Sequence, residues 1–374
     1  MTEIKPETKV NRIMVGTSAL ITIDKILPGK GVHVGSALDI AKQVLVNNSD
    51  NGVLRGGEGH YRLAMWPVDA SLALKGSLTV ISKEKWTHWI DLMIKMSRKI
   101  DLVPTTITKT EAHDVPWARV DNLPALVYMC DELELVDKYR ADLNRLIRVY
   151  NFEYLQYGLI KMDTAGDWKD TIHRPSSAYA NIFALKMLQI AEKHGLFSTI
   201  TSANLEAQIE DKLWLPDGGY RDFPATNELG VDASVLDLYL NVIPKNHKAI
   251  IARLENEDIF EPFPLRTAVK DYNVTAPHLV PVLTKWTAHK YHSLTSWPHW
   301  GMMYAIALIN NEMTDKAVVM YGKLSGMIEK FRTIPETINE LGKLYSEFLT
   351  SEKGFTIGAG LFLELEQKIQ PFIK

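Results

Sequence analysis

The sequence contains 374 residues, of which 46% are hydrophobic and 23% are charged. These proportions are typical of a globular protein with a large buried core, and they exclude an intrinsically disordered chain. The formal net charge of −3 excludes the strong positive field that nucleic acid or an anionic membrane would require. We therefore expect a neutral small-molecule ligand, with no nucleic acid or membrane as partner.

The single cysteine, Cys130, lies in the apolar run LVYMCDEL and is predicted to be a buried side chain rather than a reactive thiol. No disulfide can form within the chain. Near the N-terminus, the apolar stretch VGTSALITI is too short to cross a bilayer. These features predict a cytoplasmic protein, and the sequence calls for no cofactor.

Helical periodicity predominates along the chain, and two kinds of helix alternate. One kind has a charged face and an apolar face; these helices are predicted at 36–47, 82–99, 136–150, 201–214, 245–257 and 314–332. The other kind is almost free of charge; these helices are predicted at 68–81, 122–130, 176–190, 232–243, 297–310 and 355–365. A helix that is apolar on all sides must be surrounded by protein, so the second kind is expected to form an inner layer.

The connections alternate in step with the helices. Links from inner to outer helices are short, whereas links from outer to inner helices are long, at 48–67, 100–121, 158–175, 215–230, 258–292 and 333–354. Long loops in a compact domain are usually functional. The pattern predicts an all-α fold, an (α/α)6 toroid of six helical hairpins over residues 36–374, with its long loops on one face. Residues 1–35 form an extension with room for a strand or two, and the polar outer helices indicate a monomer or a weak homo-oligomer.

Polar residues stand at the predicted starts of four inner helices. PVDAS at 67–71 and GVDAS at 230–234 place Asp69 and Asp232 there, and Asp121 and Ser176 open two more. Such residues are typical N-caps, because their side chains accept hydrogen bonds from free backbone N–H groups. Aligned inner helices would also direct the positive ends of their dipoles toward the loop face.

The long loops and helix starts carry the residue types of a carbohydrate site. Aromatic faces pack against the C–H faces of pyranose rings, while fixed polar groups select among hydroxyls. The candidates for substrate binding are Tyr61, Arg62, Trp66, Trp117, Trp168, His173, Arg174, Asp222, Trp297, His299 and Trp300.

Two of the long loops also carry carboxylates suited to hydrolysis. Asp167 and Asp170 flank Trp168 in the third loop, and Glu336 follows a proline in the sixth loop, which lies opposite in the order of hairpins. Inverting hydrolysis of a glycoside requires an acid that protonates the leaving oxygen and an ionised carboxylate that activates water from the other side. Opposite loops of a ring can supply such a pair.

Four short motifs resemble those of six-hairpin glycosidases, in the same order. GDWKDT at 166–171 resembles the general-acid segment in the glucosidase domain of glycogen-debranching enzymes, and WPVDASL at 66–72 is similar to the Pro-Val-Asp segment of neutral invertases. SWPHWG at 296–301 and IPET at 334–337 resemble the tryptophan-rich helix start and the proline-glutamate loop of both families. The resemblance extends from about residue 50 onward. It implies Asp170 as the general acid, with Asp167 as the competing acid, and Glu336 as the general base. Its implied substrate contacts are Asp69, Trp168, Arg174, Trp297 and His299.

The expected function is thus an inverting glycoside hydrolase acting on an α-linked glucoside. A short oligosaccharide is the expected substrate, because the region before residue 36 has no room for a separate domain that would hold a polymer. Two alternatives stay open. Sugar 2-epimerases are also six-hairpin toroids and work through histidines, and the long loops or helix starts hold His60, His113, His173 and His299. The second alternative is a toroid that binds carbohydrate without catalysis.

Two further signals are set aside. GGEG at 56–59 lacks the spacing of a phosphate-binding loop and is predicted to be a flexible loop. His289, His292 and His299 have no carboxylate or cysteine at a spacing that suits a metal, so no metal site is predicted.

Overall fold

The computed structural model describes residues 31–49, 52–113, 119–155, 158–162, 166–271, 290–346 and 350–373. The strand or two predicted for the N-terminal extension would fall mainly within residues 1–30, outside this described part. Across the described residues the chain forms twelve α-helices, one 3-10 turn, η1 (Pro244–Asn246), and one short antiparallel pair of strands, β1 (Thr106–Ile107) and β2 (Ala112–His113). No helix in these ranges is long and apolar enough to span a bilayer.

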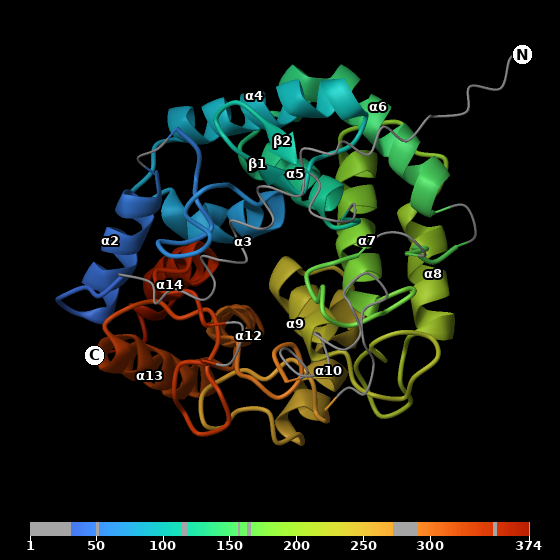
Figure 1. The fold of residues 1–374 in the computed structure, drawn as a ribbon. Coiled ribbons are helices and arrows are strands. Elements are labelled where there is room, and N and C mark those ends of the chain that lie inside the picture. Colours follow the sequence, from blue (N-terminus) through green and yellow to red (C-terminus); the bar gives the residue numbers. More distant parts are fainter. Residues whose placement is uncertain are drawn as a thin grey trace, which may run out of the picture.

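The helices form two concentric rings, which confirms the predicted all-α toroid (Figure 1). The inner ring consists of α3 (Pro67–Ser77), α5 (Asn122–Glu132), α7 (Ala178–Lys193), α9 (Val231–Leu240), α12 (Pro298–Asn310) and α14 (Thr356–Ile369). Each inner helix packs against the next, and α14 packs against α3 to close the ring. The outer ring consists of α2 (Ala37–Ser49), α4 (Lys83–Ile100), α6 (Val136–Tyr154), α8 (Ser202–Lys212), α10 (His247–Glu255) and α13 (Thr314–Phe331).

Burial separates the two rings as the charge pattern predicted. In the inner helix α9 every residue is buried, and in α12 only the last two residues are not. The outer helix α4 buries one stripe, from Trp86 and Trp89 to Met96 and Ser97, and exposes its charged face. Ser82 caps the start of α4 by accepting a hydrogen bond from a backbone N–H, and Asp101 ends it in the left-handed conformation.

Two glycines allow the first and last inner helices to approach closely. A Cβ atom on Gly76 of α3 would overlap the carbonyl oxygen of Gly360 in α14. A Cβ atom on Gly360 would in turn press on the backbone of Ala73. The contact that closes the ring therefore requires the absence of a side chain at both positions.

Of the four predicted N-caps, only Asp121 occupies the N-cap position, and none of the four side chains forms the predicted cap hydrogen bond. Asp69 and Asp232 lie within the first turn of their helices, and neither helix start has a side-chain cap hydrogen bond. Asp121 occupies the N-cap position of α5, but its carboxylate accepts hydrogen bonds from an arginine instead. Ser177, rather than Ser176, caps α7. Asp121 is instead held by the Arg119 side chain, and Asp232 accepts hydrogen bonds from Trp168 and Arg174.

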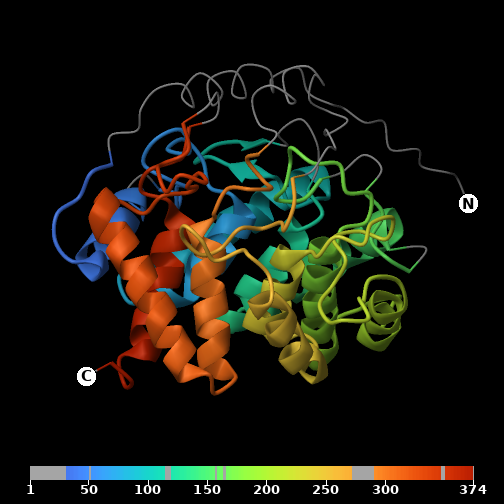
Figure 2. The ribbon, with the colours of Figure 1, turned by 90° about the horizontal axis from the view of Figure 1, so that it is seen from below.

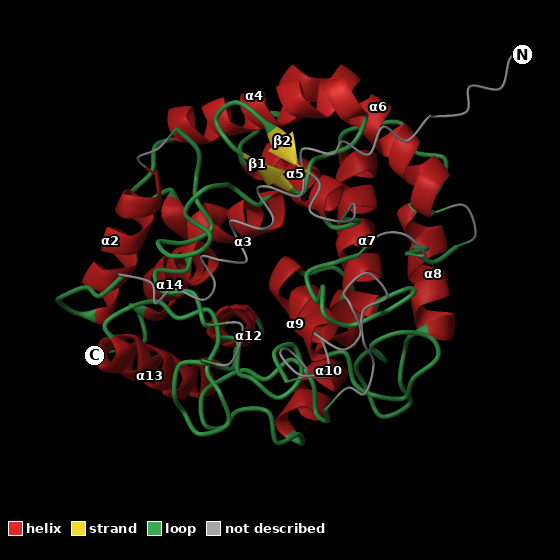
Figure 3. Cartoon of the chain, in the orientation of Figure 1, coloured by secondary structure: helices red, strands yellow, loops and turns green. Residues whose placement is uncertain are grey.

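The long connections all run from an outer to an inner helix and gather at one end of the toroid (Figures 2 and 3). Backbone contacts tie neighbouring loops together at this end. Met65 pairs with Ile107, linking the first loop to the second, and Ser296 pairs with Ile338, linking the fifth to the sixth. This end therefore presents a structured surface to a ligand.

Candidate active site

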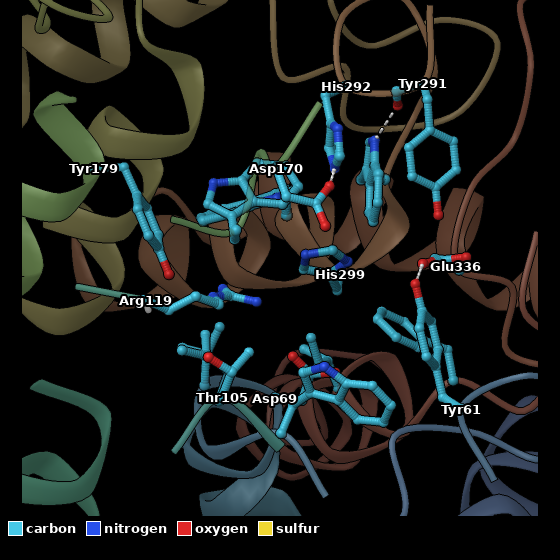
Figure 4. A pocket seen from close by; sticks show the side chains of 18 residues that line it. Tyr61, Asp69, Thr105, Arg119, Asp170, Tyr179, Tyr291, His292, His299 and Glu336 are labelled. Carbon is cyan, nitrogen blue, oxygen red and sulfur yellow. Dashed lines mark hydrogen bonds and ion pairs between the residues drawn. The ribbon is translucent and has the colours of Figure 1, made fainter. Parts of the chain in front are cut away.

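A cavity lies at the loop end of the ring, where six inner helices begin (Figure 4). Its empty volume is about 930 Å³, with the open space at its mouth included. The lining comes from the helix starts and from the long loops, and comprises Tyr61, Trp66, Val68, Asp69, Leu72, Thr105, Arg119, Trp168, Asp170, Tyr179, Tyr291, His292, Trp297, His299, Trp300, Glu336, Phe355 and Ile357. The position and size suit a ligand of one or a few sugar rings.

Glu336 enters the cavity from the sixth long loop and is held from two sides. The Tyr61 hydroxyl donates to Glu336 Oε1 at 2.8 Å, and the backbone N–H of Glu352 donates to Glu336 Oε2 at 3.0 Å. The backbone N–H of Glu336 in turn donates to the carbonyl of Glu352 at 3.0 Å. The Glu336 side chain is buried, and each of its oxygens accepts a hydrogen bond, so the orientation of the carboxyl group in the cavity is fixed.

Asp170 enters from the third long loop, and its side chain is 47% exposed. His292 lies beside it, with Nε2 3.9 Å from Asp170 Oδ1, while His292 Nδ1 is 2.6 Å from the Thr171 hydroxyl. In Figure 4, Asp170 and Glu336 lie on different sides of the same opening. Two carboxyl groups from separate loops thus face one space.

A third carboxyl group, Asp69, comes from the first turn of α3. Burial raises the pKa of Asp69 to about 7, against the attraction of Arg119; the charge of Glu336 adds to the rise. Arg119 itself donates two hydrogen bonds to Asp121, at 3.0 and 2.6 Å. At neutral pH Asp69 is therefore divided between its protonated and ionised forms, so it can donate or accept a hydrogen bond.

Aromatic side chains form one wall of the cavity. The Trp168 ring centroid lies 5.1 Å from the centroids of both Trp297 and Trp300, and Trp297 stacks on His292 at 5.0 Å. Trp297 is fixed through its Nε1–H, which donates to the carbonyl of Tyr291 at 2.8 Å. Such rigid aromatic faces suit the C–H faces of a pyranose ring.

Two polar atoms in this wall have no hydrogen-bond partner among the described residues. They are Nδ1 of His299 and Nε1 of Trp300. Burial lowers the pKa of His299 to about 3, so its ring is neutral and one ring nitrogen accepts. Since buried polar groups are nearly always paired, these atoms suit the hydroxyl groups of a ligand.

A cluster of buried charges lies next to the aromatic wall. The Arg174 guanidinium contacts Asp167 at 2.6 Å, Asp222 at 2.7 Å and Asp232 at 2.9 Å. The Lys169 ammonium lies 3.3 Å from Asp232, and its Nζ donates to the Thr267 carbonyl at 2.9 Å. Trp168 Nε1 donates to Asp232 at 2.7 Å. The cluster therefore holds the segment from Asp167 to Lys169, which immediately precedes Asp170.

The site residues predicted from the sequence divide into those that line the cavity and those that do not. Nine of them line the cavity: Tyr61, Trp66, Asp69, Trp168, Asp170, Trp297, His299, Trp300 and Glu336. Asp167, Arg174 and Asp222 belong to the buried charge cluster and do not line the cavity. Arg62 is exposed and His173 is partly buried, both outside the lining set, and Trp117 lies outside the described residues.

Sequence reasoning missed half of the lining. The polar residues missed are Thr105, Arg119, Tyr179, Tyr291 and His292, and the apolar ones are Val68, Leu72, Phe355 and Ile357. Arg119 stands just before an inner helix, and Tyr291 and His292 stand in an aromatic-rich loop, so their positions carried a usable signal. The apolar residues carry no signal that distinguishes them from the core. Among the described residues, no group of three or more His, Cys, Asp or Glu side chains could hold a metal ion.

Solved structures similar to this chain are glycosidases. A wild-type glycosidase matches with a TM-score of 0.65 at 12% sequence identity, over 89% of this chain and 96% of that chain. A bacterial glucoamylase complexed with acarbose matches with a TM-score of 0.66 at 10% identity, over 89% of this chain and 55% of that chain. A mannosylglycerate hydrolase from Thermus thermophilus matches with a TM-score of 0.60 at 12% identity, over 87% of this chain and 98% of that chain.

No protein-family model matches the sequence, and no curated protein sequence matches it. The chain thus has the α/α-toroid fold of six-hairpin glycosidases, and the resemblance seen in the short motifs is confirmed at the level of the fold.

Proposed function

We propose that the protein is an inverting glycoside hydrolase that acts on a short α-linked glucoside. The observation that carries this proposal is the presence of Asp170 and Glu336, from the third and sixth long loops, in the lining of one cavity. Inversion requires an acid and a base that approach the scissile bond from different sides.

Glu336 is the proposed general base. Its two oxygens accept hydrogen bonds from the Tyr61 hydroxyl and a backbone N–H, which hold the carboxyl group in the cavity in the fixed position that a general base requires. During hydrolysis Glu336 removes a proton from a water molecule while the water oxygen bonds to the anomeric carbon. The bond from that carbon to the leaving oxygen breaks on the opposite face.

Asp170 is the proposed general acid, and it gives its proton to the leaving oxygen. Asp167, the competing acid, is engaged with Arg174 at 2.6 Å and with the Ser177 hydroxyl at 2.5 Å. Asp167 is thus held inside the buried charge cluster and does not line the cavity, whereas Asp170 opens into the cavity. The pKa of Asp69, raised to about 7, would also suit a general acid. We assign Asp69 to the binding of a substrate hydroxyl because it lies beside Arg119, and an Asp69→Asn variant tests this assignment.

The aromatic wall supports a sugar substrate. Trp168, Trp297 and Trp300 offer apolar faces, and the unpartnered nitrogens of His299 and Trp300 offer hydrogen bonds to hydroxyl groups. One of the solved neighbours is a glucoamylase complexed with acarbose, which supports an α-glucoside as the substrate.

The epimerase alternative has less support from the cavity. Of the four histidines proposed for it, His60 and His173 do not line the cavity, and the side chain of His113 lies outside the described residues. Only His299 lines it, and its pKa is lowered to about 3, which makes it a weak base.

The test measures glucose release from maltose, isomaltose, sucrose and trehalose by the wild type and single variants. Asp170→Asn and Glu336→Gln are each expected to lower kcat by roughly 10²–10⁴-fold, the usual contribution of a general acid or base. Asp69→Asn is expected mainly to raise KM, and the exposed Arg62→Met serves as a control with near-wild-type rates. If Asp69→Asn abolishes kcat and Asp170→Asn does not, Asp69 is the acid. Conversion of a free reducing sugar without hydrolysis would indicate an epimerase, and binding without turnover would indicate a non-catalytic toroid.

A further inference from the structure

We infer that Glu352 is a positioning residue for the proposed base, and that the glycine-rich segment 56–59 folds around its carboxylate to fix Tyr61, His60 and Glu336 as one unit. The inference rests on the proposed function of Glu336. It concerns a residue that does not line the cavity and a segment that sequence reasoning predicted to be a flexible loop.

The Glu352 carboxylate is buried and is surrounded by donors from the first long loop. The backbone N–H of Gly59 donates to Oε1, and the backbone N–H of Tyr61 donates to Oε2 at 3.3 Å. His60 Nδ1 lies 2.9 Å from Oε2. Three consecutive residues thus converge on one carboxylate, although they are separated from it by more than 290 positions in the chain.

The glycines of GGEG make this arrangement possible. A Cβ atom on Gly57 would lie 2.5 Å from Cγ of Glu352, and one on Gly59 would lie 2.8 Å from its Oε1. Both distances are well below an ordinary contact, so any side chain at either position would displace the carboxylate. The segment therefore cradles a carboxylate of its own chain.

Each group fixed by Glu352 then acts on Glu336. The Tyr61 hydroxyl donates to Glu336 Oε1 at 2.8 Å, and the Glu352 backbone N–H donates to Glu336 Oε2 at 3.0 Å. His60 Nε2, which has no hydrogen-bond partner among the described residues, lies 3.8 Å from Glu336 Oε2. The Glu352 carboxylate thus contacts both residues whose side chains reach Glu336 from the first long loop, His60 and Tyr61, while the Glu352 backbone contacts Glu336 directly.

The test compares Glu352→Gln with Glu364→Gln. Both residues are buried glutamates, but Glu364 lies in α14 and accepts a hydrogen bond from Tyr239 at 2.8 Å, outside the cavity. In Glu352→Gln an amide N–H₂ replaces one of two oxygens that each accept from a backbone N–H, of Gly59 or of Tyr61, so the cradle should open. We expect kcat to fall by at least about tenfold with KM within about twofold, whereas Glu364→Gln should keep the wild-type kcat even if its melting temperature falls equally.

A double variant separates positioning from general structural loss. If Glu352 acts through Tyr61 and Glu336, the kcat loss of Tyr61→Phe combined with Glu352→Gln should be smaller than the product of the two single losses. A product that is fully multiplicative, or a Glu352→Gln enzyme within twofold of wild-type kcat, would overturn the inference while leaving Glu336 as the base.

A crystal structure of Glu352→Gln tests the placement itself, whether or not the wild type hydrolyses any glycoside in the panel. Loss of the 2.8 Å bond between the Tyr61 hydroxyl and Glu336 is the expected result. Retention of that bond, with the 56–59 segment unchanged, would overturn the inference. An inactive wild type together with an opened cradle would instead contradict only the proposed function.

Discussion

Arg174 is expected to be the charged residue whose removal destabilises this fold most. Its guanidinium is fully buried and contacts three aspartates, Asp167, Asp222 and Asp232, at 2.6 to 2.9 Å. The cluster contains one further cation, Lys169, whose ammonium lies near Asp222 and Asp232, so Arg174→Met would leave three buried carboxylates with one cation and would remove the guanidinium that contacts Asp167. Methionine fills much of the volume of the arginine stem, so the main change is the loss of the charge.

The expected magnitude follows from the burial. Removing one partner of a buried ion pair destabilises a protein by about 3–5 kcal/mol. An unfolding entropy of about 2.1 cal/mol/K per residue gives roughly 0.8 kcal/mol/K for 374 residues. We therefore expect Arg174→Met to lower the melting temperature by about 4–6 °C. The melting temperature of Arg174→Lys should lie between those of the wild type and Arg174→Met. An ammonium keeps the charge but cannot reach three carboxylates as a planar guanidinium does.

Differential scanning calorimetry at neutral pH measures this shift. Arg62→Met, at an exposed position, serves as the matched control and should stay within about 1 °C of the wild type. A melting temperature for Arg174→Met within the same 1 °C would refute the view that Arg174 balances the three aspartates. Loss of catalysis without loss of stability would instead place Arg174 in direct contact with substrate.

Three further predictions concern the ring closure, the third cavity carboxyl and the cysteine. Gly76→Ala would overlap the backbone of Gly360 and should lower the unfolding midpoint in urea strongly, whereas Gly322→Ala, an exposed helical site with open space around it, should raise the free energy of unfolding by about 0.5–1 kcal/mol. Because the pKa of Asp69 rises from 3.8 to about 7 on folding, the folded chain binds the extra proton and stability falls as pH rises through this window. Asp69→Asn should make that fall shallower in urea titrations between pH 4 and 8, and an unchanged slope would contradict the shift. Burial raises the pKa of the Cys130 thiol, so a disulfide reagent should modify it only after unfolding, and rapid modification of the folded protein would show that it is accessible.

The fold was predictable because burial in a toroid repeats along the sequence. A helix such as 297–310, almost without charge, can only lie inside, and the charged 82–99 can only lie outside. The alternation of short and long links then fixes which end of each hairpin faces the site. The order of hairpins predicts that the third and sixth loops lie on opposite sides of one opening, whereas the choice of Asp170 and Glu336 within those loops came from the resemblance of GDWKDT and IPET to glycosidase motifs.

The partners of individual side chains were not predictable in the same way. Asp167 and Asp170 stand three positions apart in one loop, yet the first is buried against Arg174 and the second opens into the cavity. Residue type reports what a side chain can do, but tertiary packing decides what it faces. The same holds for Glu352, whose donors come from the far end of the chain.

The stereochemistry of hydrolysis tests the central claim most directly. Proton NMR of the first minutes of α-glucoside hydrolysis resolves the anomeric signals before mutarotation mixes them. With Asp170 as the acid and Glu336 as the base, β-glucose should appear first, and the signal should be lost in Asp170→Asn and in Glu336→Gln. Initial release of α-glucose, or undiminished release of β-glucose by both variants, would contradict the account.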